Sequence, residues 1–449
     1  MSTARGIAAQ VIGDVCERGA YSNLALRSAL RATALDRRDR DLATELTYGT
    51  LRRLRRIDHA IGRDADRPVP RMSERARTLL RLGTYQLLEL RIPPHAAVGE
   101  TVSLATGRER GYVNAILRAL AADPPPLPEG DGDDAIGIRA GMSPWIVGEL
   151  RNLVGDGDLE RAAGAFAERA PLCVRANPCV ANVEELEASF REAGLDPRRG
   201  VIAPDCLLVE GSAVEDLPGY ARGAFAVQDQ ASAFVGHAVG ALAGERVLDA
   251  CAGPGGKAGI LACAVAPDGH LVAADVGVGR ALLAAGALRR LRTDASLLVQ
   301  DARRPALRPG TFDRVLVDAP CTGIGSARRR PELLWRPDEA RLSELARLQV
   351  AIATAAADLL RPGGRLVYSV CTFPRAETVA VCDALVRARP ELVPTAIDGP
   401  DGPSERIRLW PHLHGTDGMF LAGFTKGRSP ARGGGPPGEG GSPRLGLAS

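Results

Sequence analysis

Apolar residues recur at helical spacing throughout residues 4–121. In the first segment, Ile7, Val11 and Val15 fall on one face of a helix. A second stripe consists of Leu42, Leu46, Leu54, Ile57 and Ile61. Because no alternating pattern typical of strands interrupts these stripes, we predict an all-α domain over residues 1–125.

A stretch rich in Pro and Gly, residues 123–134, follows the helical region. Proline lacks the backbone N–H that a helix needs, so the run DPPPLP predicts a linker. The next hundred residues mix helical and strand periodicities. Helices are predicted at 143–153, 158–168 and 183–193, and short strands at 172–176 and 206–210. We interpret residues 137–240 as a small α+β connector that positions a bound partner.

After Gly244 the pattern alternates between short apolar strands and helices. Strands are predicted at 246–249, 270–275, 296–300, 314–318 and 365–370, and helices after Lys257, at 280–291 and at 338–360. This alternation is typical of a parallel sheet with helices on both faces. We therefore predict a Rossmann-like α/β domain over 241–426. Residues 427–449, rich in Gly and Pro, are predicted to be a disordered tail.

Composition narrows the class of protein. The chain has 449 residues, 45% of them hydrophobic, enough for several domains. No apolar run is long enough to span a membrane, and no secretory leader is evident at the start. The nine cysteines include no CxxC pair, and no His cluster has zinc spacing. We expect reduced thiols, a cytoplasmic location, no bound metal and no membrane partner.

The net charge of +3 is unevenly distributed. Residues 1–121 contain 21 Arg against 13 Asp and Glu, which gives +8 for that part. Four of these arginines, Arg52, Arg53, Arg55 and Arg56, lie on the polar side of the second helical stripe. They are candidates to bind the phosphates of a nucleic acid, and a solvated helix face is the alternative explanation.

A glycine-rich turn follows the first strand of the α/β domain. Its residues are Cys251, Ala252, Gly253, Pro254, Gly255, Gly256 and Lys257. Cys251 stands where a P-loop has its first Gly and Ala258 follows the Lys, so this is no P-loop, and the G-x-G-x-x-G dinucleotide motif is absent. The backbone of such a turn can approach a ligand closely, although a purely structural turn is the alternative.

Three aspartates end successive predicted strands: Asp275, Asp301 and Asp318. The first is placed to accept both ribose hydroxyls of an adenosine, and Asp301 can face the adenine. Each aspartate alone could be a helix cap, but three in succession are poorly explained that way. A cationic sulfonium cofactor without phosphate suits a site rich in carboxylates.

Two cysteines follow adjacent strands, Cys321 in DAPCTG and Cys371 in YSVCT. An isolated Cys is most often an inert buried residue, but the strand ends are where α/β folds place reactive groups. Carbon 5 of cytosine is a weak nucleophile until a thiolate adds to carbon 6. Asp318 beside such a thiolate is placed to stabilise the charge pushed into the ring, and a second thiol assists release.

The segments VLDACAGPGGK, VLVDAPCTGIGSARRRPELLW and LVYSVCT resemble motifs of the ribosomal RNA 5-methylcytosine methyltransferases, the RsmB/Sun branch of the NOL1/NOP2/Sun family. The similarity covers about residues 140–425. LTYGTLRRLRRIDHAI and YVNAILRAL resemble the NusB-type RNA-binding domain attached to the small-subunit branch of that family. Where the family commonly has CAAPGGK, PCSG and TCS, this chain has Gly253, Thr322 and Val370 with Thr372.

The resemblance implies an enzyme that methylates RNA with S-adenosylmethionine, with 16S ribosomal RNA as the expected substrate. We expect the protein to be a monomer. It implies that Cys371 is the nucleophile, that Cys321 assists product release and that Lys257 belongs to the active centre. Residues 251–257 and the three aspartates would contact the cofactor and the ring. Three consecutive arginines, Arg328, Arg329 and Arg330, are candidates to hold RNA phosphates beside a base turned out of its stack.

Several alternatives stay open at this point. A DNA cytosine methyltransferase would use the Pro-Cys motif and so promote Cys321, but the usual Glu-Asn-Val segment is missing. Methyltransferases of transfer RNA share the catalytic motifs. An inactive RNA-binding or antitermination factor would not need both cysteines, the aspartates and Lys257.

Overall fold

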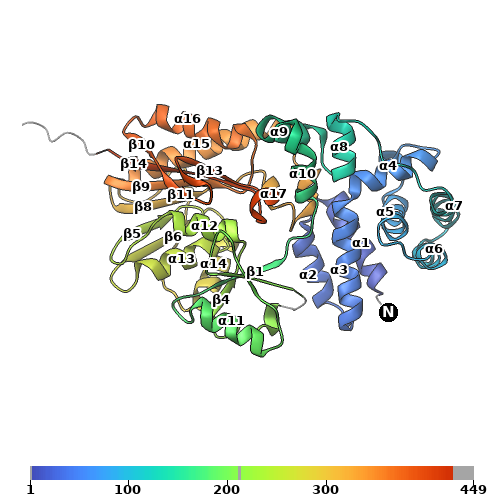
Figure 1. Cartoon of the computed structure of the whole chain (residues 1–449), viewed down its shortest axis with the longest axis horizontal. Coiled ribbons are helices and arrows are strands. Elements are labelled where there is room, and N and C mark those ends of the chain that lie inside the picture. Colours follow the sequence, from blue (N-terminus) through green and yellow to red (C-terminus); the bar gives the residue numbers. More distant parts are fainter. Residues whose placement is uncertain (1–2, 211–213, 428–449) are drawn as a thin grey trace, which may run out of the picture.

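The computed structural model describes residues 3–210 and 214–427. Apart from Gly427, the predicted disordered tail lies outside the described residues. The fold has a helical part formed by the first third of the chain, a small α+β part and a large α/β part (Figure 1). The predicted fold class is confirmed.

The N-terminal domain contains only helices, shown in blue in Figure 1. Side chains of Thr3, Asp36 and Ser73 cap three of them by accepting a backbone N–H of the first turn. The predicted stripes are buried, with Ile7 and Leu46 in one common core. The elements are α1 (Ala4–Arg18), α2 (Ser22–Arg31), α3 (Arg37–Arg52), α4 (Leu54–Asp64), the 3₁₀ turn η1 (Val69–Arg71), α5 (Glu74–Leu88), α6 (Pro94–Ser103) and α7 (Glu109–Ala122).

Three further helices bridge this domain and the α/β domain. They are α8 (Asp133–Ala140), α9 (Pro144–Val154) and α10 (Asp156–Phe166). Their core includes Ile146 and Phe166, and it is shared with Leu334 and Trp410 of the α/β domain. The sequence pattern missed α8, which begins inside the Gly- and Asp-rich stretch that was interpreted as linker.

Within the predicted connector, residues 172–210 and 214–227 form a four-stranded antiparallel sheet in the order β2-β3-β1-β4 with one covering helix, and the name connector is kept below for this part alone. Phe190 and Phe225 meet edge to face in its core. The predicted strands and helix are present, and two short strands were missed because two or three residues carry no periodicity. The elements are β1 (Leu172–Ala176), α11 (Val183–Glu192), β2 (Arg198–Arg199), β3 (Cys206–Val209), the 3₁₀ turn η2 (Val214–Asp216) and β4 (Phe225–Val227).

The α/β domain is built on a mixed sheet in the order β10-β14-β9-β8-β5-β6-β7. Strands β5 to β9 are parallel, whereas β14 runs antiparallel to β9, β10 and β13. The strands are β5 (Arg246–Asp249), β6 (His270–Asp275), β7 (Ser296–Val299), β8 (Phe312–Asp318), β9 (Leu360–Val370), β10 (Leu392–Thr395), β13 (Arg406–Leu409) and β14 (Met419–Lys426), with the separate hairpin β11 (Ile397–Gly399) and β12 (Gly402–Ser404).

Helices cover both faces of this sheet. Residues of α12 and α13 share one core with the sheet, and residues of α15 and α16 share the other. The elements are α12 (Gln230–Ala238), α13 (Gly256–Val265), α14 (Val278–Arg290), η3 (Ile324–Ser326), η4 (Pro331–Leu334), η5 (Glu339–Arg341), α15 (Leu342–Leu359), η6 (Arg375–Glu377), α16 (Val379–Ala388) and α17 (Pro411–His414). No helix among the described residues is long and apolar enough to cross a bilayer.

The expectation that all thiols are reduced was wrong for one pair, because Cys179 and Cys263 form a disulfide. The connector packs on α12 and α13 through a small core that contains Cys173 and Ile260. This packing brings two residues 84 positions apart to a Cα–Cα distance of 6.0 Å, which suits a disulfide. The disulfide therefore depends on tertiary packing, and the spacing of Cys179 and Cys263 along the chain does not predict it.

The N-terminal domain is held by residues 328–336, which we call the junction segment. Within it, Glu332 is fully buried and accepts a hydrogen bond of 2.7 Å from the Ser22 hydroxyl. The Trp335 indole N–H donates to the Leu51 carbonyl at 2.9 Å. Arg336 donates to main-chain carbonyls at the end of α1. Since this segment follows Cys321 closely, the helical domain is anchored next to the edge of the sheet where Cys321 lies.

Replacing Ser22 with Ala tests this anchoring. The substitution removes the hydroxyl donor from the buried Glu332 carboxylate, and we expect a loss of about 1–3 kcal/mol in stability. Urea denaturation followed by the fluorescence of the tryptophans, among them Trp335, measures it. Ser28→Ala on the exposed face of the same helix is the control. Equal midpoints for the two variants would contradict the proposed contribution of this contact.

Candidate active site

A cavity of about 290 Å³ opens where the parallel strands end. Its walls come from the glycine-rich turn, the strand ends, the connector and two later loops. The lining residues are Val227, Gln228, Asp229, Ser232, Asp249, Cys251, Ala252, Gly253, Pro254, Gly256, Lys257, Asp318, Ser326, Arg329, Arg330, Cys371, Asp417 and Met419. The carboxyl edge of a parallel sheet is the usual binding place in this type of fold.

The glycine-rich turn is held by Asp275 at the end of β6. The buried Asp275 carboxylate accepts the Gly253 N–H at 3.0 Å, the Gly277 N–H at 2.9 Å and the Arg280 Nε at 3.0 Å. A Cβ atom at position 253 would lie 2.7 Å from both the Arg280 Cβ and an Asp275 oxygen. Gly253, where the family commonly has Ala, therefore leaves the space that Arg280 fills.

Two predicted cofactor residues lie outside the cavity wall. Asp275 faces the back of the turn, as described, and Asp301 follows β7. The Asp301 carboxylate pairs with Arg303 at 2.6 Å, and this contact lowers the pKa of Asp301 to about 2. Asp275 ends β6, the neighbour of β5, and Asp301 follows β7, one strand further out. Their contact with a cofactor stays a prediction.

Lys257 and Asp318 form an ion pair inside the cavity. The Lys257 ammonium lies 2.7 Å from Asp318 Oδ2, and the Ser369 hydroxyl donates to Oδ1 at 2.7 Å. Burial disfavours the charged lysine, but the neighbouring carboxylate outweighs it and raises the pKa of Lys257. Burial and the charge of Asp318 raise the pKa of the nearby Asp249 to about 7. The Lys257 ammonium thus lies beside one charged carboxylate, Asp318, and near a second acid, Asp249, whose ionised form is disfavoured.

The two predicted thiols lie together. Cys321 Sγ and Cys371 Sγ are 3.5 Å apart, and Cys371 lines the cavity. The hydrogen bond with Cys321 lowers the pKa of Cys371 against the effect of burial, and Arg330 and Lys257 act in the same direction. The same hydrogen bond and burial raise the pKa of Cys321 well above its usual value. Cys371 is therefore the thiol of the pair that ionises first.

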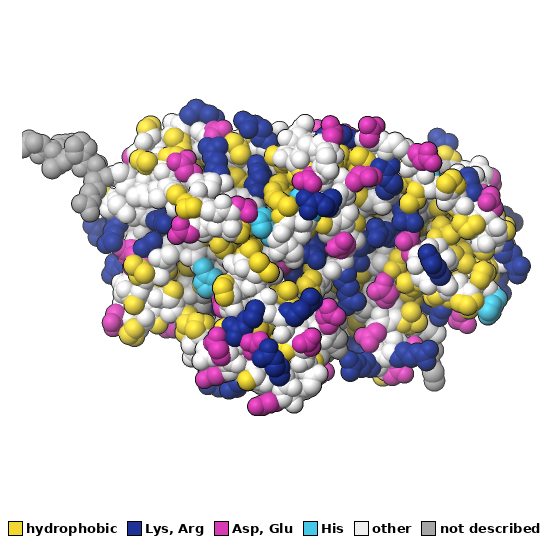
Figure 2. Space-filling view, viewed as in Figure 1, with side chains coloured by type: hydrophobic (Ala, Val, Ile, Leu, Met, Phe, Trp, Pro, Cys, Tyr) yellow, Lys and Arg dark blue, Asp and Glu magenta, His cyan; other side chains and the backbone are white. Residues whose placement is uncertain are grey.

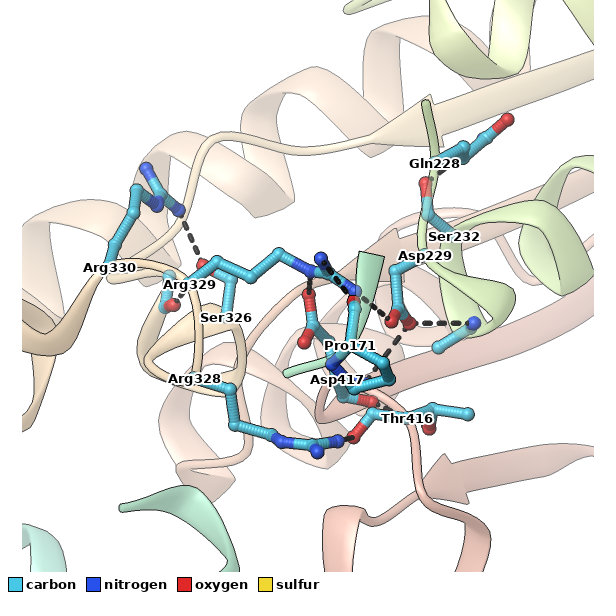
Figure 3. A network of polar contacts seen from close by, with 12 residues as sticks. Pro171, Gln228, Asp229, Ser232, Ser326, Arg328, Arg329, Arg330, Thr416 and Asp417 are labelled. Carbon is cyan, nitrogen blue, oxygen red and sulfur yellow. Dashed lines mark hydrogen bonds and ion pairs between the residues drawn. The ribbon is translucent and has the colours of Figure 1, made fainter. Parts of the chain in front are cut away.

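The three consecutive arginines have different surroundings (Figure 3). Arg328 is buried and donates to the carbonyls of Gly415 and Thr416, so its predicted role as a phosphate ligand is corrected. Arg329 pairs with Asp229 at 2.8 Å and with Asp417 at 3.1 Å.

Arg330 donates to the Ser326 hydroxyl at 2.6 Å and borders the cavity. Of the three arginines, Arg330 keeps the surroundings that a phosphate ligand needs.

The arginines of the N-terminal domain also differ from the expectation. Arg52 is buried and donates to the Arg328 carbonyl, which excludes it from a phosphate surface. Arg55 bonds Asp134 and the Met142 carbonyl, so it joins α4 to the bridging helices. Arg56 lies 2.8 Å from Glu89, and Arg53 4.0 Å from the same carboxylate. Basic and acidic side chains are interspersed over the face shown in Figure 2.

Sequence reasoning missed the cavity residues that come from other parts of the chain. Asp229 caps α12, and Asp417 and Met419 precede or begin β14. Burial and the charge of Asp229 raise the pKa of Asp417 to about 6. No motif marks these residues, because they reach the cavity through the packing of the connector and of the antiparallel strand.

The α/β sheet, the glycine turn after its first strand and the acid at the end of the second together define an S-adenosylmethionine-dependent methyltransferase. Residues 239–425 match the family described as 16S rRNA methyltransferase RsmB/F, and residues 2–122 match the NusB family.

The Mycobacterium tuberculosis protein Rv1407 is 37% identical over 95% of this chain and 97% of its own. Ribosomal RNA small subunit methyltransferase B of Erwinia tasmaniensis is 33% identical over 95% and 99%. The chain belongs to the RsmB/F family of ribosomal RNA methyltransferases.

Solved structures agree with this assignment. The crystal structure of PH0851 superposes with a TM-score of 0.81 at 25% identity and covers 94% of this chain and 99% of that one. A methyltransferase homologue from Pyrococcus horikoshii has a TM-score of 0.56 at 28% identity and covers 65% and 97%.

The cavity fits the cofactor of this class. Gly255 has a φ of +104°, and a Cβ there would lie 2.9 Å from the Ala284 Cα, so only a glycine lets the turn pack this closely on α14. The carboxylates of Asp249 and Asp318 suit a cationic sulfonium. Among the described residues no group of His, Cys, Asp and Glu side chains is arranged as a metal site.

Replacing Asp275 with Asn is expected to weaken S-adenosylmethionine binding roughly 10- to 100-fold, because the amide cannot accept the same three hydrogen bonds. Isothermal titration calorimetry measures the affinity. Asp268→Asn, which alters an exposed acid at the other end of β6, should bind as the wild type does. An Asp275→Asn variant with unchanged affinity would show that the turn does not depend on this carboxylate.

Proposed function

We propose that this enzyme methylates carbon 5 of a cytosine in 16S ribosomal RNA through a covalent bond between Cys371 and carbon 6. The observation that carries the proposal is the pair of thiols 3.5 Å apart, with Cys371 on the cavity wall close to Lys257 and Asp318. We also propose that it acts as a monomer in the cytoplasm. A factor that only binds RNA would have no use for a thiol pair of opposite pKa shifts.

The first step uses the thiolate of Cys371. It adds to carbon 6, forming a C–S bond and pushing an electron pair toward ring nitrogen 3. The Lys257–Asp318 pair supplies a proton at that nitrogen, so that negative charge does not accumulate on the ring. Carbon 5 becomes nucleophilic as a result.

S-adenosylmethionine, when bound, supplies the methyl group. Residues 251–257 would form its cradle, with Asp318 near the reacting centre. Asp275, which holds the turn, and Asp301, which follows β7, would face the ribose and adenine from outside the cavity wall. The proton on ring nitrogen 3 then returns to the Lys257–Asp318 pair and the proton on carbon 5 leaves to water. The electrons of the C5–H bond form the carbon 5–carbon 6 double bond, the C–S bond breaks and its electron pair returns to Cys371. The Cys321 thiol stabilises the departing thiolate through the hydrogen bond seen between the two sulfurs.

Two parts of the chain are proposed to hold the RNA. The N-terminal domain carries the excess of positive charge, and residues 2–122 match the NusB family. Arg330 at the cavity is placed to contact a phosphate next to a base turned out of its stack. Arg53 and Arg56 can contribute only where phosphate competes with Glu89.

Single alanine substitutions at the two thiols test the mechanism. Cys371→Ala should reduce 5-methylcytosine formation to background, because no bond to carbon 6 can form. Cys321→Ala should instead slow release and leave a protein–RNA adduct that survives denaturation. Nucleoside mass spectrometry of 16S ribosomal RNA and denaturing gels measure the two effects. Cys382→Ala, at a buried free thiol away from the cavity, is the control. Adducts in Cys371→Ala would reverse the assigned roles.

A further inference from the structure

Glu377 is a fully buried carboxyl group that contacts Thr322, the residue after Cys321. It follows Cys371 by six residues in the 3₁₀ turn η6, and it does not line the cavity. No Lys or Arg side chain within residues 3–210 and 214–427 forms an ion pair with it. A buried acid without a cation is costly unless neighbouring donors satisfy it, so its contacts need an explanation.

The carboxylate binds the residue next to Cys321. The Thr322 backbone N–H donates to Glu377 Oε1 at 2.9 Å, and the Thr322 hydroxyl donates to Oε2 at 2.5 Å. The turn after β8 therefore has both its main chain and a side chain attached to this one group.

The same group reaches the residue next to Cys371. The Thr322 hydroxyl donates to Glu377, so the Thr372 hydroxyl, whose oxygen is 2.7 Å away, donates to the Thr322 oxygen. Thr372 thus reaches the carboxylate through the hydroxyl of Thr322. The residues that immediately follow the two thiols are joined through Glu377.

Gln349 on α15 completes the arrangement. Its amide N–H group donates to Glu377 Oε1 at 2.9 Å and to the Pro320 carbonyl, which precedes Cys321, at 2.9 Å. The Tyr368 hydroxyl donates to the amide oxygen of Gln349 at 3.2 Å and to the Glu377 carbonyl at 2.7 Å. Because the tyrosine occupies the oxygen side of the amide, the Gln349 nitrogen faces the carboxylate.

We propose that Glu377 is a positioning residue that holds the Cys321 and Cys371 turns in register, so that the two sulfurs stay within hydrogen-bond distance. Every neighbour of the carboxylate donates a hydrogen bond, so an acceptor with two oxygens is required there. This inference rests on the proposed function, because the register matters for catalysis only if both thiols act on the base.

Glu377→Gln is the sharpest test, since it keeps the shape and replaces one acceptor oxygen with a donor. With the sulfurs no longer held together, Cys371 loses the hydrogen bond that lowers its pKa, while Lys257, Arg330 and Asp318 still face it. The pH midpoint of Cys371 alkylation, followed by peptide mass spectrometry with iodoacetamide, should move upward. Methyl transfer should fall in kcat by roughly 10- to 100-fold with little change in KM for RNA.

Substitutions at Thr322 provide a second test, which remains valid if the Glu377→Gln variant does not fold. Thr322→Val removes the hydroxyl and should shift the Cys371 alkylation midpoint in the same direction. Thr322→Ser keeps the hydroxyl and should behave as the wild type does, which a purely steric role of Thr322 would not explain.

An unchanged midpoint in both Glu377→Gln and Thr322→Val overturns the inference while leaving the proposed function intact. A wild-type enzyme that forms no 5-methylcytosine overturns the proposed function instead, and the alkylation measurement still reports on Glu377.

Discussion

The parallel pairing of β8 with β9 is the constraint on which the site depends. Asp318 lies opposite Ser369 in this register, and the serine hydroxyl bonds the aspartate. β8 ends three residues before Cys321 and β9 ends one residue before Cys371, so the register itself places the two sulfurs at the same edge. A change of register between β8 and β9 would move the two thiols apart, and it would also move Ser369 away from Asp318.

Buried polar contacts extend from this edge to the rest of the chain. Glu377 binds Thr322, next to Cys321, directly and Thr372, next to Cys371, through the Thr322 hydroxyl. On the cavity side, Lys257 neutralises Asp318. The junction segment, residues 328–336, continues directly from the Cys321 loop to the N-terminal helices through Glu332 and Trp335. The RNA-binding candidate domain and the reacting centre are therefore parts of one connected framework.

The pattern of apolar residues predicted the strands that form the centre of the sheet. β5 and β6 have the predicted bounds, because the start and the end of a hydrophobic run can be read from the sequence. For the same reason Asp318 and the residues before Cys371 were correctly expected at strand ends. The antiparallel β14, the disulfide between Cys179 and Cys263 and the cavity residue Asp417 arise from long-range packing, so no local pattern marks them.

The arginines show most clearly what the sequence alone cannot predict. A run of arginines has the same sequence pattern whether its side chains face solvent or bond to buried carbonyl groups. Arg328 and Arg330 are two residues apart, yet only the second borders the cavity. Charge predicted a basic domain, but the partner of each guanidinium depends on how the domains pack.

The central claim is that Cys371 bonds to carbon 6 of the target base. RNA containing 5-fluorocytidine tests it directly with the unaltered enzyme and S-adenosylmethionine, because fluorine on carbon 5 cannot leave as a proton does and the adduct persists. Peptide mass spectrometry of the digested complex should find a methylated nucleotide attached to Cys371. Attachment at Cys321, or transfer of methyl groups to unmodified RNA with no adduct on the fluorinated RNA, would contradict the account.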